Sequence, residues 1–337
     1  GQEDKYYTQF ETKNINFIKL KIKPSYFSLF SDLFDLLKIL YYVKLKQPTA
    51  IHTFNPKPMI FGYVTTFFNK NLKLFIAQTG TGNLFERKKF LLPFLSTLIK
   101  KAHNKSDAVF FHNKYDSKLF LKKKLISKSK VIFIGPCVDV KKYLLKKKKK
   151  KKRIIRVICI SRLLKQKGII EFLGVADKFK KLYDKKKVEF LLVGEIERTH
   201  YDRVNGDLIR RAEKDRLIKR VIWSNNIKLL LQKSDVLFLH SYREGGPRVI
   251  IEAAACELPT IGSNAIGVRD LIINNKTGII TKVGNINLAY RALKKLIDRD
   301  DLRESYGKNA LKLIAKPVSL EKATEKQLIS YKKANIF

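Results

Sequence analysis

The chain has 337 residues, more than one hydrophobic core usually serves, so its length predicts two lobes. Hydrophobic residues make up 45% of the sequence, and this share excludes a chain that stays disordered. The formal net charge of +41 suggests nucleic acid as a partner. The lysines are spread along the whole sequence, however, and no helix-turn-helix, ribonucleoprotein or zinc-ligand pattern accompanies them, so we expect no specific nucleic-acid partner. The same charge predicts attraction to an anionic membrane surface.

Cysteine spacing and apolar runs indicate the compartment. Cys137, Cys159 and Cys256 lie far apart and form no CxxC pair, which is typical of a protein in reducing cytoplasm. No run of about 18 uncharged apolar residues is present, so we expect no transmembrane helix. The sequence opens at Gly1 without a basic-then-apolar leader, so we expect no signal peptide. Together these features predict a cytoplasmic protein.

Short apolar runs alternate with longer amphipathic stretches along the chain, a pattern typical of repeated βαβ units. The strands expected in the first half are residues 17–22, 50–54, 74–78, 108–111 and 131–134. Those expected in the second half are residues 156–160, 189–193, 236–240, 260–262 and 278–281. Helices fit between them. The fold class is therefore α/β, with two Rossmann-like parallel-sheet lobes and a cleft between them.

A basic run marks the boundary between the lobes. Residues 146–152 are seven consecutive lysines followed by Arg153, and such a run repels itself and cannot pack. We therefore expect a first lobe at residues 1–145 and a linker at 146–153. A second lobe follows at 154–318, and a C-terminal helix at 319–337 packs back toward the first lobe.

Two expected helices could meet a membrane. Residues 26–43 are rich in Phe, Leu and Tyr, and residues 90–99 follow Arg87, Lys88 and Lys89. Aromatic and leucine side chains beside basic ones are typical of a helix that lies in the membrane interface. A buried crossover helix explains both stretches equally simply, so the sequence leaves the two interpretations open.

The most informative stretch, residues 241–256, follows an expected strand and reads SYREGGPRVIIEAAAC. Gly245 and Gly246 leave backbone amides unshielded, Pro247 suits the first helical position, and the helix continues from Arg248 to residue 256. A helix N-terminus at the carboxyl end of a strand attracts anions. The stretch therefore predicts a phosphate site.

Two glutamates accompany this helix. Glu244 precedes it and Glu252 lies inside it, eight positions later. A carboxylate beside a phosphate would repel it, so these side chains are expected to accept hydrogen bonds from hydroxyl groups. A nucleotide sugar supplies both the diphosphate and the hydroxyls. Taken alone, the two glutamates could equally be surface residues.

The stretch closely resembles the donor lobe of family-4 retaining glycosyltransferases of GT-B architecture, which carries two glutamates separated by seven residues. Three further segments resemble the same lobe: CISRLLKQKG at 159–168, IGSNAIGVR at 261–269 and NKTG at 275–278. The resemblance implies a GT-B fold and a glycosyltransferase that uses a nucleotide sugar, expected to be a UDP-sugar, as its co-substrate, without a further cofactor.

The resemblance also implies roles for single residues. Arg162 and Lys167 would clamp the donor diphosphate, and cations there would balance its charge without a metal. Glu252 would hold the ribose and Glu244 the transferred sugar. The donor-binding set is completed by the segment Gly245, Gly246, Pro247 and Arg248.

Motifs of the first lobe resemble bacterial enzymes that extend lipid-linked oligosaccharides or surface polysaccharides. These motifs are HTFNPKPM at 52–59, QTGTGNLF at 78–85, FHNKYD at 111–116 and GPCVD at 135–139. The acceptor-side candidates that they supply are Lys57, Gly80, Thr81, Gly82 and Asn113. The first strand, glycine turn and helix of such enzymes have no counterpart before Gln2, so we expect the first lobe to lack its N-terminal βα unit.

The function expected from the resemblance is transfer of a hexose or N-acetylhexosamine to a glycan acceptor, expected to be linked to polyprenyl diphosphate. Such an enzyme would work at the inner face of the cell membrane. A nucleotide-sugar epimerase of GT-B architecture and a basic nucleic-acid-binding protein remain as alternatives. A dinucleotide-binding fingerprint at Gly80 and Gly82 is disfavoured because Phe85 occupies the third glycine position.

Overall fold

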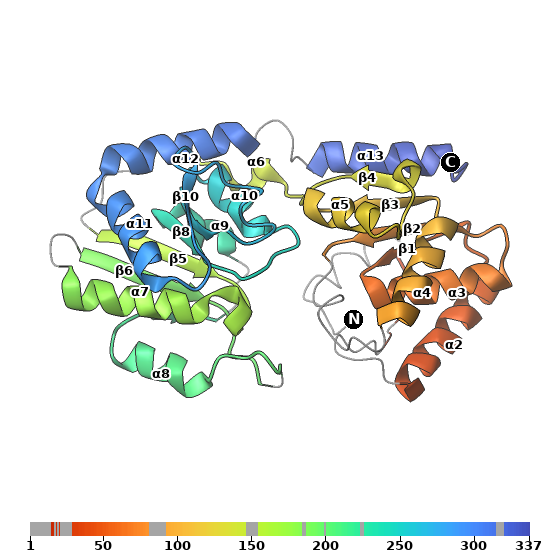
Figure 1. Ribbon diagram of the computed structural model, residues 1–337, viewed down its shortest axis with the longest axis horizontal. Helices are drawn as coiled ribbons and strands as arrows, with labels where there is room; N and C mark the ends of the chain where they lie inside the picture. The colour runs from red at the N-terminus through yellow and green to blue at the C-terminus, as the bar shows by residue number, and fades with distance from the viewer. Residues whose placement is uncertain are drawn as a thin grey trace.

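A computed structural model of the chain describes residues 15, 16, 18, 20, 29–80, 92–145, 154–183, 187–198, 200–222, 226–314 and 320–337. Two α/β lobes lie side by side, each built on a parallel sheet (Figure 1). The two-lobe α/β fold expected from the sequence is therefore confirmed.

The first lobe is a four-stranded parallel sheet in the order β1-β2-β3-β4. Its strands are β1 (Ala50–Phe54), β2 (Lys73–Gln78), β3 (Ala108–Phe111) and β4 (Val131–Phe133). Its helices are α2 (Leu29–Lys46), α3 (Pro56–Phe68), α4 (Leu92–Lys105) and α5 (Lys114–Lys122), with the 3₁₀ turn η1 (Lys128–Lys130) before β4. All four residues of β3 are buried, as expected for a strand covered on both faces.

The second lobe is a six-stranded parallel sheet in the order β10-β9-β8-β5-β6-β7. Its strands are β5 (Ile154–Ile160), β6 (Lys187–Val193), β7 (Lys219–Val221), β8 (Val236–Leu239), β9 (Thr260–Ser263) and β10 (Gly278–Thr281). Its helices are α7 (Ile169–Leu182), α8 (Gly206–Lys214), α9 (Ile227–Gln232), α10 (Arg248–Ala255), α11 (Ile286–Asp298) and α12 (Asp300–Ile314), with the 3₁₀ turn η2 (Lys165–Lys167) before α7.

The strand order of the second sheet reverses between β5 and β8. From β5 the chain adds β6 and β7 on one side and then returns to place β8 on the other side of β5. In open parallel sheets the loops that follow two such strands diverge to opposite faces and leave a crevice, where ligands bind. The fold therefore predicts that the second lobe binds its ligand after β5 and β8.

Two crossings join the lobes. The short helix α6 (Val140–Tyr143) leads from the first lobe toward the second, and α13 (Leu320–Lys333) returns the end of the chain to the first (Figure 1). Ala323 and Ala334 belong to the apolar cluster that includes Phe75 and Phe110 of the first sheet. The basic run at 146–153 lies outside the described residues.

The expected strands agree with the observed ones at most positions, and β1, β3 and β10 agree to the residue. The sequence missed β7, a three-residue edge strand whose residues are Lys219, Arg220 and Val221 and which shows no apolar run. Of the strand expected at 17–22, only Ile18 and Leu20 are described, and neither belongs to a strand. Helix α10 begins at Arg248, so Pro247 is its N-cap and not its first helical residue.

Candidate functional site

The loops after β5 and β8 meet at the reversal point of the second sheet. The backbone amide of Tyr242, after β8, donates to the carbonyl of Gln166, after β5, over 2.9 Å. Gly168 adopts a left-handed conformation with φ of 73°, and a Cβ built there would overlap the carbonyl oxygen of His240. Glycine therefore lets the η2 turn pack directly on the end of β8.

This packing brings Lys167 and Glu244 together. The Lys167 ammonium lies 2.7 Å from Glu244 Oε1, and the Ser241 hydroxyl donates to the same oxygen over 2.8 Å. The side chains are 17% and 14% exposed, so the pair is largely shielded from water but not fully buried. An ammonium has three protons to donate, and no hydrogen bond to Glu244 Oε2 comes from the residues that the structure describes. Both groups can therefore engage a ligand while remaining paired.

Arg162 stands at the end of β5 on the same side of the sheet. Its side chain is exposed, and it forms no ion pair with any residue that the structure describes. Helix α10 begins nearby at Arg248, and Pro247 offers no side chain to cap its first amides. The arrangement presents one exposed guanidinium, one ammonium and one uncapped helix end, which together suit an anion.

Glu252 lies about one helical turn after Arg248 in α10. Its side chain is half-buried against the segment that joins the lobes. Burial raises the pKa of its carboxyl, whereas Arg248, a hydrogen bond from Tyr143 and the charge of Lys142 pull that pKa down. Arg248 is exposed, and together with burial it lowers the pKa of His112 in the first lobe. Glu252 therefore faces the boundary between the lobes and not the far side of the second lobe.

The loop between β8 and α10 carries Gly245 and Gly246, and we call it the glycine loop. It touches the first lobe directly. A Cβ on Gly245 would overlap the carbonyl oxygen of Thr79, and one on Gly246 would lie 3.1 Å from the Pro136 side chain. Thr79 follows β2 and Pro136 follows β4, so the carboxyl ends of both sheets face each other here. The two lobes thus meet at the reversal point of the second sheet.

An ion pair spans the same boundary. Arg243 of the glycine loop lies 3.7 Å from Asp116 of α5, whose side chain is 2% exposed. Both residues lie in motifs that the sequence analysis quoted, but it assigned neither a role, because nothing local relates an Arg of one lobe to an Asp of the other. The pair couples the residue before Glu244 to the first lobe.

Three of the five acceptor-side candidates are among the described residues, and each makes a different contact. Asn113 is 4% exposed and caps α5, accepting from the Asp116 amide over 2.7 Å. Lys57 forms an ion pair of 2.9 Å with Asp32, with both side chains largely buried, and joins α3 to α2. Gly80 lies at the interlobe contact, since its own Cβ would come within 3.2 Å of Gly245 Cα. Thr81 and Gly82 lie outside the described residues.

The buried carboxyl group of Glu171 lies beside the site, and the sequence did not single it out. The Tyr242 hydroxyl donates to Glu171 Oε1 over 2.6 Å, and this hydrogen bond is the largest cause that raises the pKa of Tyr242 to about 12. Glu171 belongs to α7 and is 5% exposed. The sequence signal was an acidic residue in the first turn of a helix, which is usually read only as a favourable dipole contact.

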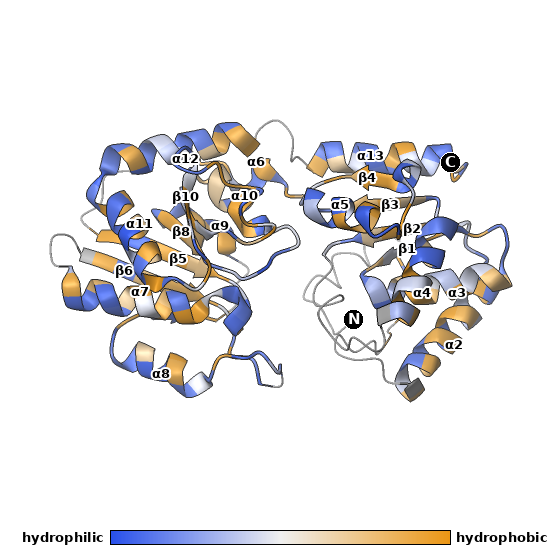
Figure 2. Ribbon diagram, in the orientation of Figure 1, coloured by the Kyte–Doolittle hydropathy of each residue, from blue (hydrophilic) through white to orange (hydrophobic). Residues whose placement is uncertain are grey.

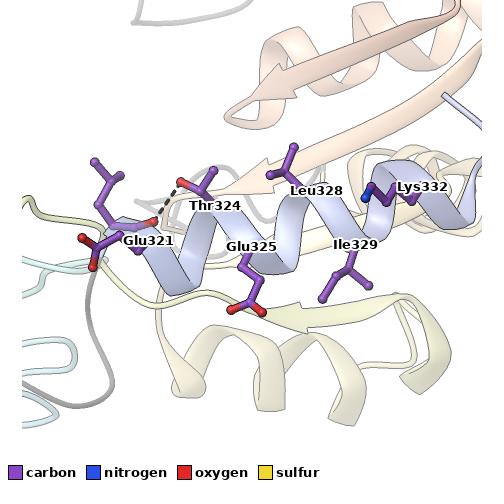
Figure 3. A pocket seen from close by; sticks show the side chains of 7 residues that line it. Glu321, Thr324, Glu325, Leu328, Ile329 and Lys332 are labelled. Carbon is purple, nitrogen blue, oxygen red and sulfur yellow. Dashed lines mark hydrogen bonds between the residues drawn. The ribbon is translucent and has the colours of Figure 1, made fainter. Parts of the chain in front are cut away.

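A separate surface pocket runs along the outer face of α13. Its described lining comes entirely from this helix and includes Leu320, Glu321, Leu328 and Ile329 (Figure 3). Glu321 pairs with Lys141 over 2.8 Å, and both side chains are strongly exposed. The pocket contains none of the residues singled out from the sequence.

Comparison with known proteins relates this geometry to a family. Residues 140–313, more than half of the chain, match the family described as glycosyl transferases group 1. The capsular polysaccharide biosynthesis glycosyltransferase CapM of Staphylococcus aureus is 25% identical over 303 residues, which are 85% of this chain and 77% of that protein. The UDP-Gal:alpha-D-GlcNAc-diphosphoundecaprenol alpha-1,3-galactosyltransferase of Escherichia coli is 25% identical over 318 residues, 89% of this chain and 79% of that protein.

A solved structure with the same architecture is that of Anabaena HepE in complex with UDP and glucose. It superposes with a TM-score of 0.76 at 16% identity, covering 97% of this chain and 88% of that one. The fold is GT-B, as the resemblance implied, and the matched segment begins at α6 and contains the Lys167–Glu244 pair. The chain belongs to the group 1 family of glycosyl transferases.

Proposed function

We propose that the protein is a retaining, metal-independent glycosyltransferase of family 4 that transfers a hexose or N-acetylhexosamine from a UDP-sugar to a lipid-linked glycan. The observation that carries the proposal is the shielded Lys167–Glu244 pair at the reversal point of the second sheet. A cation for phosphate and a carboxylate for sugar hydroxyls stand side by side there, which is the combination that a nucleotide sugar requires.

In this proposal Arg162, Lys167 and the uncapped start of α10 bind the donor diphosphate, with the amides of Gly245 and Gly246 beside it. Pro247 keeps the helix end open, and Arg248 adds positive charge. Glu252 accepts from the ribose hydroxyls and Glu244 Oε2 from the transferred sugar. Support for separate roles comes from the different surroundings of the two carboxylates, one paired with Lys167 and one beside Arg248 and Tyr143.

The proposed reaction is substitution on one face of the sugar. The bond from the anomeric carbon to the diphosphate breaks, the bond to the acceptor oxygen forms, and the departing diphosphate takes the acceptor's proton. Lys167, Arg162 and the α10 dipole would stabilise the charge that grows on the leaving group, which is why we expect no metal requirement. The protein otherwise orients the two substrates.

For the acceptor we propose a glycan carried on polyprenyl diphosphate, used in surface polysaccharide assembly. The names of the S. aureus and E. coli relatives support this class, since they specify capsular polysaccharide and a diphosphoundecaprenol substrate. The acceptor would approach from the first lobe, past Gly80, Thr81, Gly82 and Asn113. Lys57 would act there indirectly, through its pairing with Asp32.

We further propose that the protein works as a peripheral protein on the cytoplasmic face of the cell membrane, where a lipid-linked acceptor is anchored. None of the helices among the described residues is long and apolar enough to cross a bilayer. The net charge of +41 supports attraction to anionic lipid.

The experiment that tests the proposal measures protection against thermal unfolding by a panel of nucleotide sugars. A ligand present at about 100 times its dissociation constant stabilises the folded state by about 2.7 kcal/mol. We expect UDP-sugars to protect, and transfer to a diphosphopolyprenyl-glycan to persist in EDTA. Absence of protection by every donor would contradict the proposal. Conversion of the donor to its epimer without an acceptor would favour the epimerase alternative.

A further inference from the structure

Helix α2 presents a row of large apolar side chains to the outside of the first lobe. Phe30, Leu33, Phe34, Leu37, Tyr41 and Leu45 are between 53% and 83% exposed. With 100° per residue, these six positions fall within an arc of about 120° on the helix surface. Much of the α2 ribbon is accordingly coloured as hydrophobic in Figure 2. We call these six residues the α2 apolar face.

The two acidic side chains of α2 are turned inward, which is the reverse of an ordinary surface helix. Asp32 and Asp35 are only 7% and 6% exposed, and Asp32 pairs with Lys57 of α3 over 2.9 Å. A buried ion pair fixes the rotation of a helix about its axis, because turning α2 over would leave Lys57 buried without its carboxylate. The apolar face is therefore held outward by specific contacts.

The exposed charges on α2 itself are all positive. Lys38, Lys44 and Lys46 of α2 are exposed, and both acidic residues of the helix are buried. Helix α3, which packs against α2, adds the exposed side chains of Phe67 and Phe68. A large exposed apolar surface with a basic border marks a contact site.

We infer that the α2 apolar face seats the first lobe in the surface of an anionic lipid bilayer, with the helix parallel to the membrane plane. Aromatic and leucine side chains would enter the boundary between headgroups and acyl chains, while the lysines contact acidic headgroups. A second copy of the chain fits less well when the two helices run parallel, because that twofold contact would bring Lys44 of both copies together. The inference rests on the proposed function for its purpose, since a lipid-linked acceptor lies in that plane.

Flotation with vesicles tests the inference on the full chain. Wild type should float with phosphatidylglycerol vesicles at low salt and much less with phosphatidylcholine vesicles. A variant carrying Phe30→Ser, Phe34→Ser and Leu37→Ser should bind the anionic vesicles about tenfold more weakly or worse. The matched control removes exposed leucines from the second lobe, Leu182→Ser with Leu208→Ser, and should bind like wild type.

A fluorescent probe locates the docking face, and its result does not depend on the stability of the triple serine variant. Trp223 is the only tryptophan, so Phe34→Trp in a Trp223→Phe background places a single indole on the α2 apolar face. Vesicles with brominated acyl chains should quench it, whereas Leu182→Trp in the same background should stay bright. Bound protein with an unquenched α2 probe would place docking elsewhere and overturn the inference.

Two other results would also overturn it: wild type that stays off anionic vesicles at low salt, or a dimer that the triple serine variant abolishes. The docking result is separable from the proposed function. If nucleotide sugars protect the protein but vesicles do not bind, the docking face is wrong and the enzyme assignment stands. If vesicles bind through α2 but no nucleotide sugar protects the protein, the docking face is correct and the enzyme assignment is wrong.

Discussion

Lys167 and Glu244 form the central contact of the candidate site at the residue scale. Their ion pair is 2.7 Å long and largely shielded from water, so each side chain is held in place before a ligand arrives. We predict that Lys167→Ala weakens UDP binding by about 1.5 to 3 kcal/mol, roughly tenfold to a hundredfold, because a charge-assisted contact to the diphosphate is lost. Isothermal titration with UDP measures the change directly.

The matched control is Lys165→Ala, which removes an exposed lysine from the same 3₁₀ turn and should leave UDP binding unchanged. Glu244→Gln should also bind UDP nearly as wild type does, but should turn over slowly because its carboxylate no longer orients the sugar. Equal UDP affinity in wild type and Lys167→Ala would show that the ammonium does not hold the diphosphate.

The glycine loop after β8 is the feature that matters at the element scale. Gly245 lies so close to the first lobe that any Cβ would overlap the Thr79 carbonyl oxygen, so only glycine permits this approach. We predict that Gly245→Ala disfavours the lobe contact by about 1 to 3 kcal/mol, the usual cost of overpacking. Turnover should fall, while the thermal stability of each lobe changes little, because the lobes can separate to relieve the clash.

Paired assays of turnover and of thermal unfolding check this prediction. Gly206→Ala at the start of α8 serves as the control, since the nearest atoms there include the flexible end of Arg210. If Gly245→Ala retained full turnover, the lobes would not need to meet at this loop during the reaction. A large loss of thermal stability would instead indicate that the loop supports the fold of its own lobe.

At the scale of the whole molecule, α13 ties the end of the chain to the first lobe. The Tyr331 ring packs with its centroid 4.6 Å from that of Phe75, and its hydroxyl lies 2.7 Å from His52 Nδ1. We predict that Tyr331→Ala destabilises the first lobe by about 3 to 5 kcal/mol, as for other large aromatic truncations. Tyr331→Phe should lose only about 1 to 3 kcal/mol, from the orphaned histidine nitrogen.

Amide hydrogen exchange can test this lobe by lobe. Tyr331→Ala should speed exchange in β2 and β3, and the amides of β5 and β6 provide an internal reference in the second lobe. Leu328→Ala, on the exposed side of the same helix, should leave all four strands protected. Exchange that quickened equally in both lobes would mean that they unfold as one unit.

The sequence by itself determined the class of the fold and most of its strands. Short continuous apolar runs such as β3 and β8 are typical of strands buried on both faces, and their alternation with amphipathic helices predicts parallel sheets. The glycine-rich stretch after β8 also indicated a helix start suited to an anion, and α10 begins one residue later than expected. The sequence did not predict edge strand β7, because a short edge strand needs no apolar run.

Only the tertiary structure decided which residues lie together. The order β8-β5-β6 places the loops of Lys167 and Glu244 side by side, and no local pattern encodes that order. The same holds for Lys57, which the sequence assigned to the acceptor side and the fold pairs with Asp32. The sequence also left the first long helix open between a buried and an interfacial role, and the burial of its two aspartates turned its apolar face outward. Hydrophobic period and turn chemistry are local properties that a sequence displays directly, whereas contacts between distant loops depend on how whole sheets are ordered and packed.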